Sequence, residues 1–319
     1  MSLQPGRGEP SPVILTSPLW RYFLATRPAF LPATFVAVLV GLACAHVDGI
    51  SLQRLPAALT LLFALLAHAG ANVLNDYYDA LNGTDAANSE RLFPFTGGSR
   101  FIQNGVLTAR QMALFGATLL AVVVTAGLWL AAYSGVGLLG IGLLGLLIGW
   151  AYSAPPLKLA SRGLGEIAVT VGWLLVVVGA DYVQRGDFGF MPLVGGLGYA
   201  LLLANLRFIN QFPDWRSDAL TGKRTLVVRL GRRTARWVYL VLALAAHGWL
   251  LVGIARGILP DAAIVAMLAA PLALHGAQGL WQHAEAPARL ARAIKFSAAA
   301  VLVHGLLLAG ALLLYGGHS

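Results

Sequence analysis

The sequence predicts an all-α, polytopic membrane protein, and two observations carry this prediction: the composition and nine long apolar segments. Hydrophobic residues make up 58% of the 319-residue chain and charged residues only 11%, whereas about 25% of residues in an average soluble protein are charged. A soluble fold of this length could not cover its surface with so few charges. The mean hydropathy of +0.74 points the same way. The composition therefore excludes an ordinary soluble protein.

Each apolar segment approaches the length of about 20 residues that a helix needs to cross a bilayer. The nine segments are Ala29–Val47, Leu55–Tyr77, Gln111–Ala132, Gly135–Tyr152, Glu166–Val183, Phe190–Phe212, Thr234–Ala255, Leu259–Trp281 and Ala293–Tyr315. Because only Tyr133 and Ser134 separate the third segment from the fourth, these two helices should form a tight hairpin. We therefore expect one transmembrane domain over residues 29–315, preceded by an N-terminal segment (1–28) and followed by a short tail (316–319).

The distribution of basic residues predicts the orientation, since Lys and Arg are concentrated in cytoplasmic segments of membrane proteins. If the N-terminus is cytoplasmic, 18 of the 22 Lys and Arg lie in cytoplasmic segments, three lie on the opposite side and Arg207 lies inside the sixth span. This asymmetry accounts for most of the net charge of +9 without a nucleic-acid partner. We expect an inner-membrane protein whose C-terminus is on the outer side.

Two acidic clusters stand out, because carboxylates near membrane spans are costly and are functional candidates by default. Both begin with Asn-x-x-x-Asp, and both stand at the cytoplasmic end of a span. The first acidic cluster, at the end of the second span, comprises Asn72, Asp76, Asp79 and Asp85. The second acidic cluster, at the end of the sixth span, comprises Asn210, Asp214 and Asp218.

The spacing within each cluster predicts a polar stripe, since residues three or four apart share a helix face. Gly83 should help to turn the chain toward Asp85, and Pro213 should kink or end the sixth helix. Two facing stripes would bring five carboxylates together, and these would repel one another unless cations lay between them. Carboxylate oxygens suit Mg²⁺, which keeps waters and binds substrate phosphates. The alternative, solvated helix caps, explains one such cluster better than two.

Basic residues flank both acidic clusters in the sequence. Arg100 follows a Gly-Gly-Ser loop that could present backbone N–H groups to an anion. Lys223 and Arg224 follow the second acidic cluster, and Lys158 lies in the loop after the fourth span. Acids that hold a metal beside bases that hold oxyanions form the arrangement that a diphosphate requires.

These features resemble the UbiA superfamily of intramembrane prenyltransferases. The resemblance rests on the two acidic clusters at the second and sixth of nine helices, and it extends to Arg27-Pro28 before the first span. It implies a nine-helix bundle around a central cavity that opens to the cytoplasm and laterally to lipid. It also implies Mg²⁺ held between the aspartates and the diphosphate of a polyprenyl donor. Segments 75–85, 163–166 and 222–231 look most like the 1,4-dihydroxy-2-naphthoate prenyltransferases of menaquinone synthesis.

The resemblance implies a role for each candidate residue. Carboxylates would hold the metal, basic side chains would neutralise the diphosphate until an allylic cation forms, and the electron-rich ring of an aromatic acceptor would attack that cation. The metal ligands would come from Asp76, Asp79, Asp85, Asp214 and Asp218. The diphosphate would contact Arg27, Arg100, Lys158, Lys223 and Arg224, and Tyr152 would touch the diphosphate or the cation. Asn72 and Asn210 would orient carboxylates or contact the acceptor.

One departure from that branch concerns the acceptor. Many of its members read Asn-Asn-x-Arg-Asp in the second motif, whereas residues 210–214 read Asn-Gln-Phe-Pro-Asp. The arginine is absent and Pro213 stands in its place. Transfer to 4-hydroxybenzoate or homogentisate is therefore an alternative within the enzyme class. A cation-coupled transporter is an alternative outside it, although coupling ions usually bind near the membrane midplane rather than at helix ends.

Other signals predict no function. The single cysteine, Cys44, excludes an intrachain disulfide. Residues 135–140 match the letters of the dinucleotide-binding fingerprint but lie in a predicted membrane helix with no strand before it. The seven histidines show no metal-binding spacing. Asp181, near the outer end of the fifth span, is interpreted as a solvated or capping residue.

Overall fold

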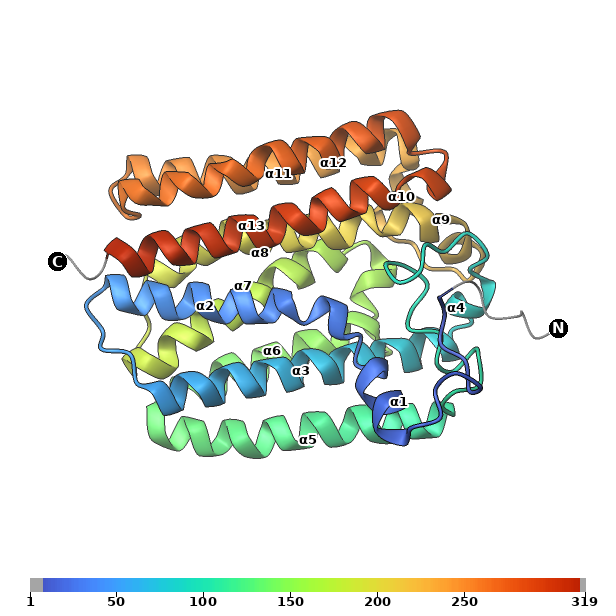
Figure 1. The fold of residues 1–319 in the computed structure, drawn as a ribbon, viewed down its shortest axis with the longest axis horizontal. Helices are drawn as coiled ribbons and strands as arrows, with labels where there is room; N and C mark the ends of the chain where they lie inside the picture. Colours follow the sequence, from blue (N-terminus) through green and yellow to red (C-terminus); the bar gives the residue numbers. More distant parts are fainter. Residues whose placement is uncertain (1–7, 316–319) are drawn as a thin grey trace.

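Long helices lie side by side along the longest axis of the molecule (Figure 1). The structure is a computed structural model, and it describes residues 8–315. Within these residues, eight helical segments are long and apolar enough to cross a membrane. They are η1 with α2 (Pro28–Val47), α3 (Arg54–Leu81), α5 (Ala109–Ser134), α7 (Gly165–Arg185), α8 (Met191–Ile209), α11 (Arg232–Ala255), η3 with α12 (Asp261–His283) and α13 (Ala291–Tyr315).

A ninth apolar helix, α6 (Gly137–Ser153), is shorter at 17 residues. It follows α5 after a two-residue connection, as the predicted hairpin requires. The described residues contain no strand. The all-α class is therefore confirmed, and the nine apolar helices match the nine predicted segments. The predicted tail, 316–319, lies outside the described residues.

Short helices gather where both acidic clusters lie, and we call this region the acidic end of the bundle. It includes α4 (Thr84–Ala87), α9 (Gln211–Leu220) and α10 (Leu226–Leu230), and α1 (Pro18–Ala25) lies beside it (Figure 1). The 3₁₀ helices η2 (Leu159–Arg162) and η4 (Pro287–Arg289) complete the described elements. The C-terminus of α13 lies at the opposite end (Figure 1).

Small residues let the central helices approach closely, as is common in membrane bundles. A Cβ on Gly41 of α2 would collide with the carbonyl oxygen of Val177 in α7, and one on Gly305 of α13 would collide with Tyr199 in α8. Helix α8 is the most enclosed of the eight long spans, since 72% of the residues in its most apolar stretch are buried. It packs against α2, α7, α11 and α13.

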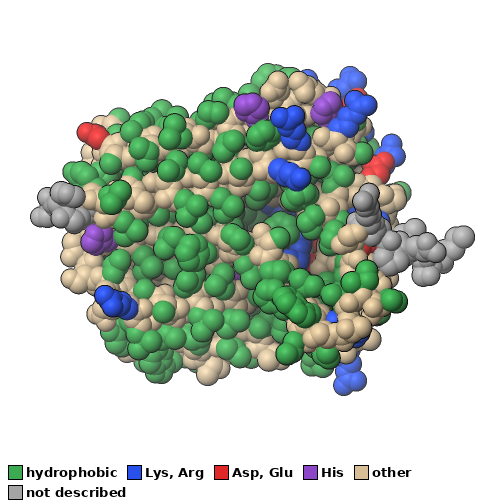
Figure 2. Space-filling model, in the orientation of Figure 1, with side chains coloured by type: hydrophobic (Ala, Val, Ile, Leu, Met, Phe, Trp, Pro, Cys, Tyr) green, Lys and Arg blue, Asp and Glu red, His purple; other side chains and the backbone are tan. Residues whose placement is uncertain are grey.

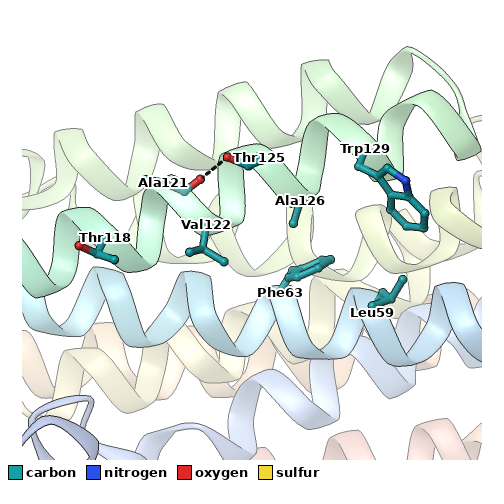
Figure 3. A pocket seen from close by; sticks show the side chains of 8 residues that line it. All are labelled: Leu59, Phe63, Thr118, Ala121, Val122, Thr125, Ala126 and Trp129. Carbon is teal, nitrogen blue, oxygen red and sulfur yellow. Dashed lines mark hydrogen bonds between the residues drawn. The ribbon is translucent and has the colours of Figure 1, made fainter.

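The outer surface fits a lipid environment. Figure 2 shows hydrophobic side chains over most of one face, whereas Lys and Arg gather near the acidic end. Exposed leucines such as Leu143 and Leu244 would face acyl chains. An apolar groove of about 690 Å³ runs between α3 and α5, lined by residues that include Phe63, Val122 and Trp129 (Figure 3). It contains no charged residue and lies away from the acidic clusters.

The structure corrects the interpretation of Asp181. This residue is 0% exposed, so it is neither solvated nor a simple cap. Both of its carboxylate oxygens accept hydrogen bonds of 2.8 Å from Arg185, which lies four residues later in α7. Arg185 also donates to Asp48 at the end of α2, at 2.6 Å. The three charges join two helices at the end opposite the acidic clusters.

Candidate functional site

The first acidic cluster lies where α3 ends and the chain turns into α4. Helix α3 continues to Leu81, so Asp76 and Asp79 occupy its last turns, and both are buried. Gly83 adopts φ +75°, a left-handed conformation that glycine accepts without steric cost. The turn places Asp85 in α4, where it is also buried.

The loop after α4 forms a tight cradle against these carboxylates. Gly98 has φ +71°, and a Cβ placed on it would lie within 3.1 Å of carboxylate oxygens from both Asp76 and Asp85. The backbone N–H of Ser99 donates to Asp76 Oδ2 at 3.1 Å. Asp76 Oδ1 is buried and has no hydrogen-bond partner in the described part of the chain. An unpaired buried acceptor of this kind is costly unless a ligand satisfies it.

The second acidic cluster follows a break between two helices. Helix α8 ends at Ile209 and α9 begins at Gln211, with Asn210 between them. Pro213 has no backbone N–H to continue the α8 hydrogen-bond ladder, and this agrees with the break. Asp214 and Asp218 then lie one turn apart on α9. Asn210 is buried, and its Oδ1 has no hydrogen-bond partner within residues 8–315.

The two clusters meet around Lys223, in the loop after α9. Lys223 Nζ lies 2.7 Å from Asp79 Oδ1 and 3.9 Å from Asp218 Oδ1. Two further contacts join the two regions. Asn88, which follows the first acidic cluster, donates to Asp214 Oδ1 at 2.6 Å, and the hydroxyls of Thr84 and Thr221 lie 3.2 Å apart. The fold thus assembles one polar site from parts of the chain more than 120 residues apart.

Burial and mutual repulsion set the electrostatics of this site. Burial raises the pKa of Asp85, and the neighbouring Asp79 and Asp76 raise it further. Burial also raises the pKa of Asp218 to about 7. Burial alone would lower the pKa of Lys223, but Asp79 and Asp218 hold it above its usual value. The site therefore has more carboxylates than nearby cations and favours the arrival of further positive charge.

The donor set fits a divalent cation that keeps part of its own hydration. Among residues 8–315, no three His, Cys, Asp or Glu side chains converge tightly enough to enclose a metal. Mg²⁺ does not require this, since it usually takes one or two protein carboxylates and completes its shell with waters and phosphate oxygens. Within the described residues, Asp76 Oδ1 accepts no hydrogen bond and lies 3.7 Å from Arg27 Nη1, and Asn210 Oδ1 accepts none either, so these are acceptors that such a cation would use.

The predicted basic residues differ in their positions. Arg27 Nη1 lies 3.7 Å from Asp76 Oδ1, and Lys158 donates to Asn82 at the end of α3, at 2.8 Å. Arg100 is only 2% exposed. It donates to the backbone carbonyl of Asp85 and lies 4.0 Å from Glu9, so it supports the loop instead of facing an open site. The side chain of Arg224 is exposed, and no contact joins it to the clusters.

Sequence reasoning missed Arg207 as a site residue. It lies in the last turn of α8, and its Nε donates to the hydroxyl of Tyr152 at 2.9 Å. Burial raises the pKa of Asp214, and Arg207 is the strongest of the groups that lower it. The available signal was its position, since a charged residue within a span is a functional candidate. Asn72 is half-buried and donates to the backbone carbonyl of Thr26 at 3.0 Å.

The described residues form a bundle of membrane helices with one buried, carboxylate-rich site at its acidic end. Residues 30–300 match the UbiA prenyltransferase family. The chain belongs to this family and is a prenyltransferase.

Its relatives include enzymes of naphthoquinone synthesis. The chain is 30% identical over 291 residues to the 1,4-dihydroxy-2-naphthoate octaprenyltransferase of Mycobacterium tuberculosis, a match that covers 90% of this chain and 94% of the relative. The enzyme of the same name from Bacillus subtilis is 27% identical over 316 residues, covering 97% and 96%. The 2-carboxy-1,4-naphthoquinone phytyltransferase of Synechocystis is 27% identical over 232 residues, covering 70% of each chain.

Solved structures share the fold. A UbiA homologue from Aeropyrum pernix superposes with a TM-score of 0.65 at 18% identity, covering 86% of this chain and 96% of that one. A UbiA homologue from Archaeoglobus fulgidus, solved with DMAPP and Mg²⁺, gives a TM-score of 0.59 at 16% identity, covering 90% and 99%.

Proposed function

We propose that this prenyltransferase transfers a polyisoprenyl group from its diphosphate to 1,4-dihydroxy-2-naphthoate, in a Mg²⁺-dependent step of menaquinone biosynthesis. The observation that carries the proposal is the meeting of the two acidic clusters around Lys223, at 2.7 Å from Asp79 and 3.9 Å from Asp218. The naphthoate octaprenyltransferases that match most of the chain support this acceptor. We further propose that the N-terminus and the acidic end face the cytoplasm, since 18 of 22 basic residues would then be cytoplasmic.

Metal binding would draw on both clusters. Asp76 and Asp85 converge on Gly98, and Asp214 and Asp218 approach from α9, so these four are the proposed ligands. When bound, Mg²⁺ would neutralise negative charge on the departing diphosphate. The homologue from Archaeoglobus fulgidus that was solved with DMAPP and Mg²⁺ supports the use of this ion. Asp79 would hold Lys223 in place, at 2.7 Å.

The chain's own cations would bind the diphosphate as its bond to C1 breaks. Lys223 keeps its proton at neutral pH because Asp79 and Asp218 raise its pKa. It can therefore bind a diphosphate oxygen as a full positive charge. Arg27, half-buried and 3.7 Å from Asp76, would bind from the α1 side. Charge stabilisation at the leaving group is the largest contribution we assign to these residues.

The acceptor ring attacks C1 of the allylic cation that remains after the C1–O bond breaks. One C–C bond forms, and the ring regains its aromaticity by losing a proton or, where the attacked carbon carries a carboxylate, CO₂. The electron pair of the C1–O bond leaves with the diphosphate. Asn72 and Asn210 lie at the start of each cluster, where they would orient carboxylates or contact the acceptor. The surrounding apolar helices would limit the access of bulk water to the cation.

A different aromatic acceptor is the second candidate, and Pro213 favours it. The naphthoate branch often carries an arginine at this position of the second motif, and this chain does not. The experiment therefore compares aromatic acceptors.

The test uses purified protein with a labelled polyprenyl diphosphate and 1,4-dihydroxy-2-naphthoate, with and without Mg²⁺. We expect Mg²⁺-dependent prenylated product that is lost in Asp76→Ala and in Asp214→Ala. Asp187→Ala is the matched control, because Asp187 is exposed between α7 and α8 and the full length of α8 separates it from the second acidic cluster. Diphosphate release with a different acceptor only would reject the naphthoate. No Mg²⁺-dependent turnover with any aromatic acceptor would favour a transporter.

A further inference from the structure

The two terminal nitrogens of the Arg207 guanidinium lie beside the site, and we call them the Arg207 fork. The Nε of Arg207 donates to Tyr152 at 2.9 Å. Within residues 8–315, its two terminal nitrogens make no hydrogen bond and the side chain forms no ion pair. These nitrogens are not fully enclosed, because the residue is half-buried. A guanidinium held by one nitrogen and open at the other two can accept a planar anion.

Among the described residues, the neighbouring acids form no hydrogen bond or ion pair with this fork, and each accepts from another donor. The hydrogen-bond pairs are Asn88 with Asp214, Thr225 with Asp218 and Gln211 with Glu166. The positive charge of Arg207 reaches Asp214 and Asp218, since it lowers the pKa of each against the larger effect of burial. Arg207 therefore lies close to the aspartates of α9 without being paired to them.

The position of Arg207 separates it from the proposed metal ligands of α9 and from the proposed diphosphate ligands. Asp214 and Asp218 lie beyond the end of α8, whereas Arg207 lies inside the span Met191–Ile209. Tyr152, which holds Arg207, is on α6, and its ring packs 3.8 Å from where a Cβ on Gly165 of α7 would lie. The fork thus belongs to the α6–α7–α8 side of the site, whereas Lys223 and Arg27 approach the acidic clusters from the loops outside it.

A carboxylated acceptor offers the matching group. A carboxylate is planar and pairs with two guanidinium nitrogens at once, which fixes orientation as well as position. The naphthoate octaprenyltransferases and the carboxynaphthoquinone phytyltransferase among the relatives all act on a carboxylated ring. This chain has Pro213 where the second motif often carries an arginine. Arg207 lies six residues before Pro213, in the last turn of the α8 span.

We propose that Arg207, held by Tyr152, binds the carboxylate of the aromatic acceptor and so orients the ring toward C1 of the prenyl chain. This inference rests on the proposed function, because it requires a carboxylated acceptor. It assigns the selection of the acceptor to a residue outside both acidic clusters.

The test compares 1,4-dihydroxy-2-naphthoate with 1,4-dihydroxynaphthalene, which is the same ring without the carboxylate. In Arg207→Leu, we expect the Kd and KM for the naphthoate to rise about 10- to 100-fold, the usual range for loss of a hydrogen bond to a charged group. Binding of 1,4-dihydroxynaphthalene and the KM for the polyprenyl diphosphate should change by less than about twofold. Arg207→Lys should restore part of the affinity for the naphthoate, because it keeps the charge but not the fork.

Two further variants control the experiment. Tyr152→Phe frees the guanidinium without removing its charge, so it should weaken naphthoate binding less than Arg207→Leu does. Arg236→Leu removes a half-buried arginine of α11 that stacks on Trp281, 4.8 Å from the ring centroid, and should leave the affinity for both rings unchanged.

Each outcome decides the inference. A rise in the KM for the polyprenyl diphosphate instead of the naphthoate would mean that the fork binds the donor, and equal losses for both rings would mean a packing defect. Either result would overturn the inference while leaving the proposed function intact. If the wild type neither binds nor prenylates the naphthoate, the proposed acceptor is wrong and the inference fails with it.

Discussion

Among residues 8–315, Lys223 is the one cation that forms ion pairs with both acidic clusters, so its removal tests the assembly of the site directly. In Lys223→Met, Asp79 loses a partner at 2.7 Å and Asp218 loses one at 3.9 Å. The side chains of Lys223 and Asp79 are only 12% and 11% exposed, so water cannot replace the lost contact fully. Breaking a buried pair by removing one partner typically costs about 3–5 kcal/mol.

The assay is thermal unfolding of purified protein in detergent without Mg²⁺. A loss of this size should lower the Tm by roughly 5–10 °C for a chain of this length. The control is Arg216→Met, which breaks a 2.6 Å pair with Glu90 in which the arginine side chain is 63% exposed. A surface pair is worth about 0–1 kcal/mol, so this variant should move the Tm very little.

A double variant distinguishes pairing from packing. Lys223→Met with Asp79→Asn removes both charges, so it should recover much of the lost Tm, because no unpaired buried carboxylate remains at that position. Equal Tm shifts for Lys223→Met and Arg216→Met, or no recovery in the double variant, would refute the view that Lys223 neutralises the clusters.

Three other predictions follow from the geometry. Burial raises the pKa of Asp218 to about 7 from an ordinary 3.8, so the folded protein holds one more proton than the unfolded chain between these pH values. The stability of the metal-free protein should therefore fall as the pH rises through this window, whereas Mg²⁺ binding should strengthen up to about pH 7. Asp218→Asn should flatten both pH dependences. Gly98→Ala should abolish prenyl transfer because its Cβ would enter the space of two carboxylates, whereas Gly105→Ala, at a similar φ of +69° with open space around it, should cost stability only; equal activity in the two variants would contradict the cradle. Gly41→Ala should lower the Tm because the added Cβ would meet a carbonyl of α7, whereas Gly127→Ala on α5 meets nothing within 4 Å; a comparison of their melting curves checks this packing.

Much of the fold could be predicted from the sequence, because lipid imposes a simple rule. Every backbone polar group within the bilayer must be satisfied inside its own segment, so long apolar stretches become helices. A close connection between the third and fourth helices was correctly predicted, but it lies at Gly135 and Val136, because Tyr133 and Ser134 still belong to α5. The burial of Asp181 was not predicted, because Asp48, the second carboxylate that pairs with Arg185, lies at the end of another helix whose position the sequence does not specify.

The site was predictable in its residue types but not in its pairings. Spacing placed Asp76 and Asp79 on one helix face, and Gly83 does make the turn before Asp85. Arg100 follows the expected Gly-Gly-Ser loop, yet its guanidinium is buried and donates a hydrogen bond to the backbone carbonyl of Asp85. Spacing along the chain cannot distinguish a basic side chain that faces a ligand from one that braces a loop.

The sequence by itself determined that this protein is a helical membrane protein with two acidic clusters, because hydrophobic length and residue spacing are local properties. Only the tertiary structure decided that Lys223 lies between Asp79 and Asp218, and that Arg207 meets Tyr152 from another helix. The physical reason is distance along the chain. The contact of Arg207 with Tyr152 joins segments 55 residues apart, and that of Lys223 with Asp79 joins segments 144 residues apart. Both depend on how the helices pack rather than on any pattern within one of them.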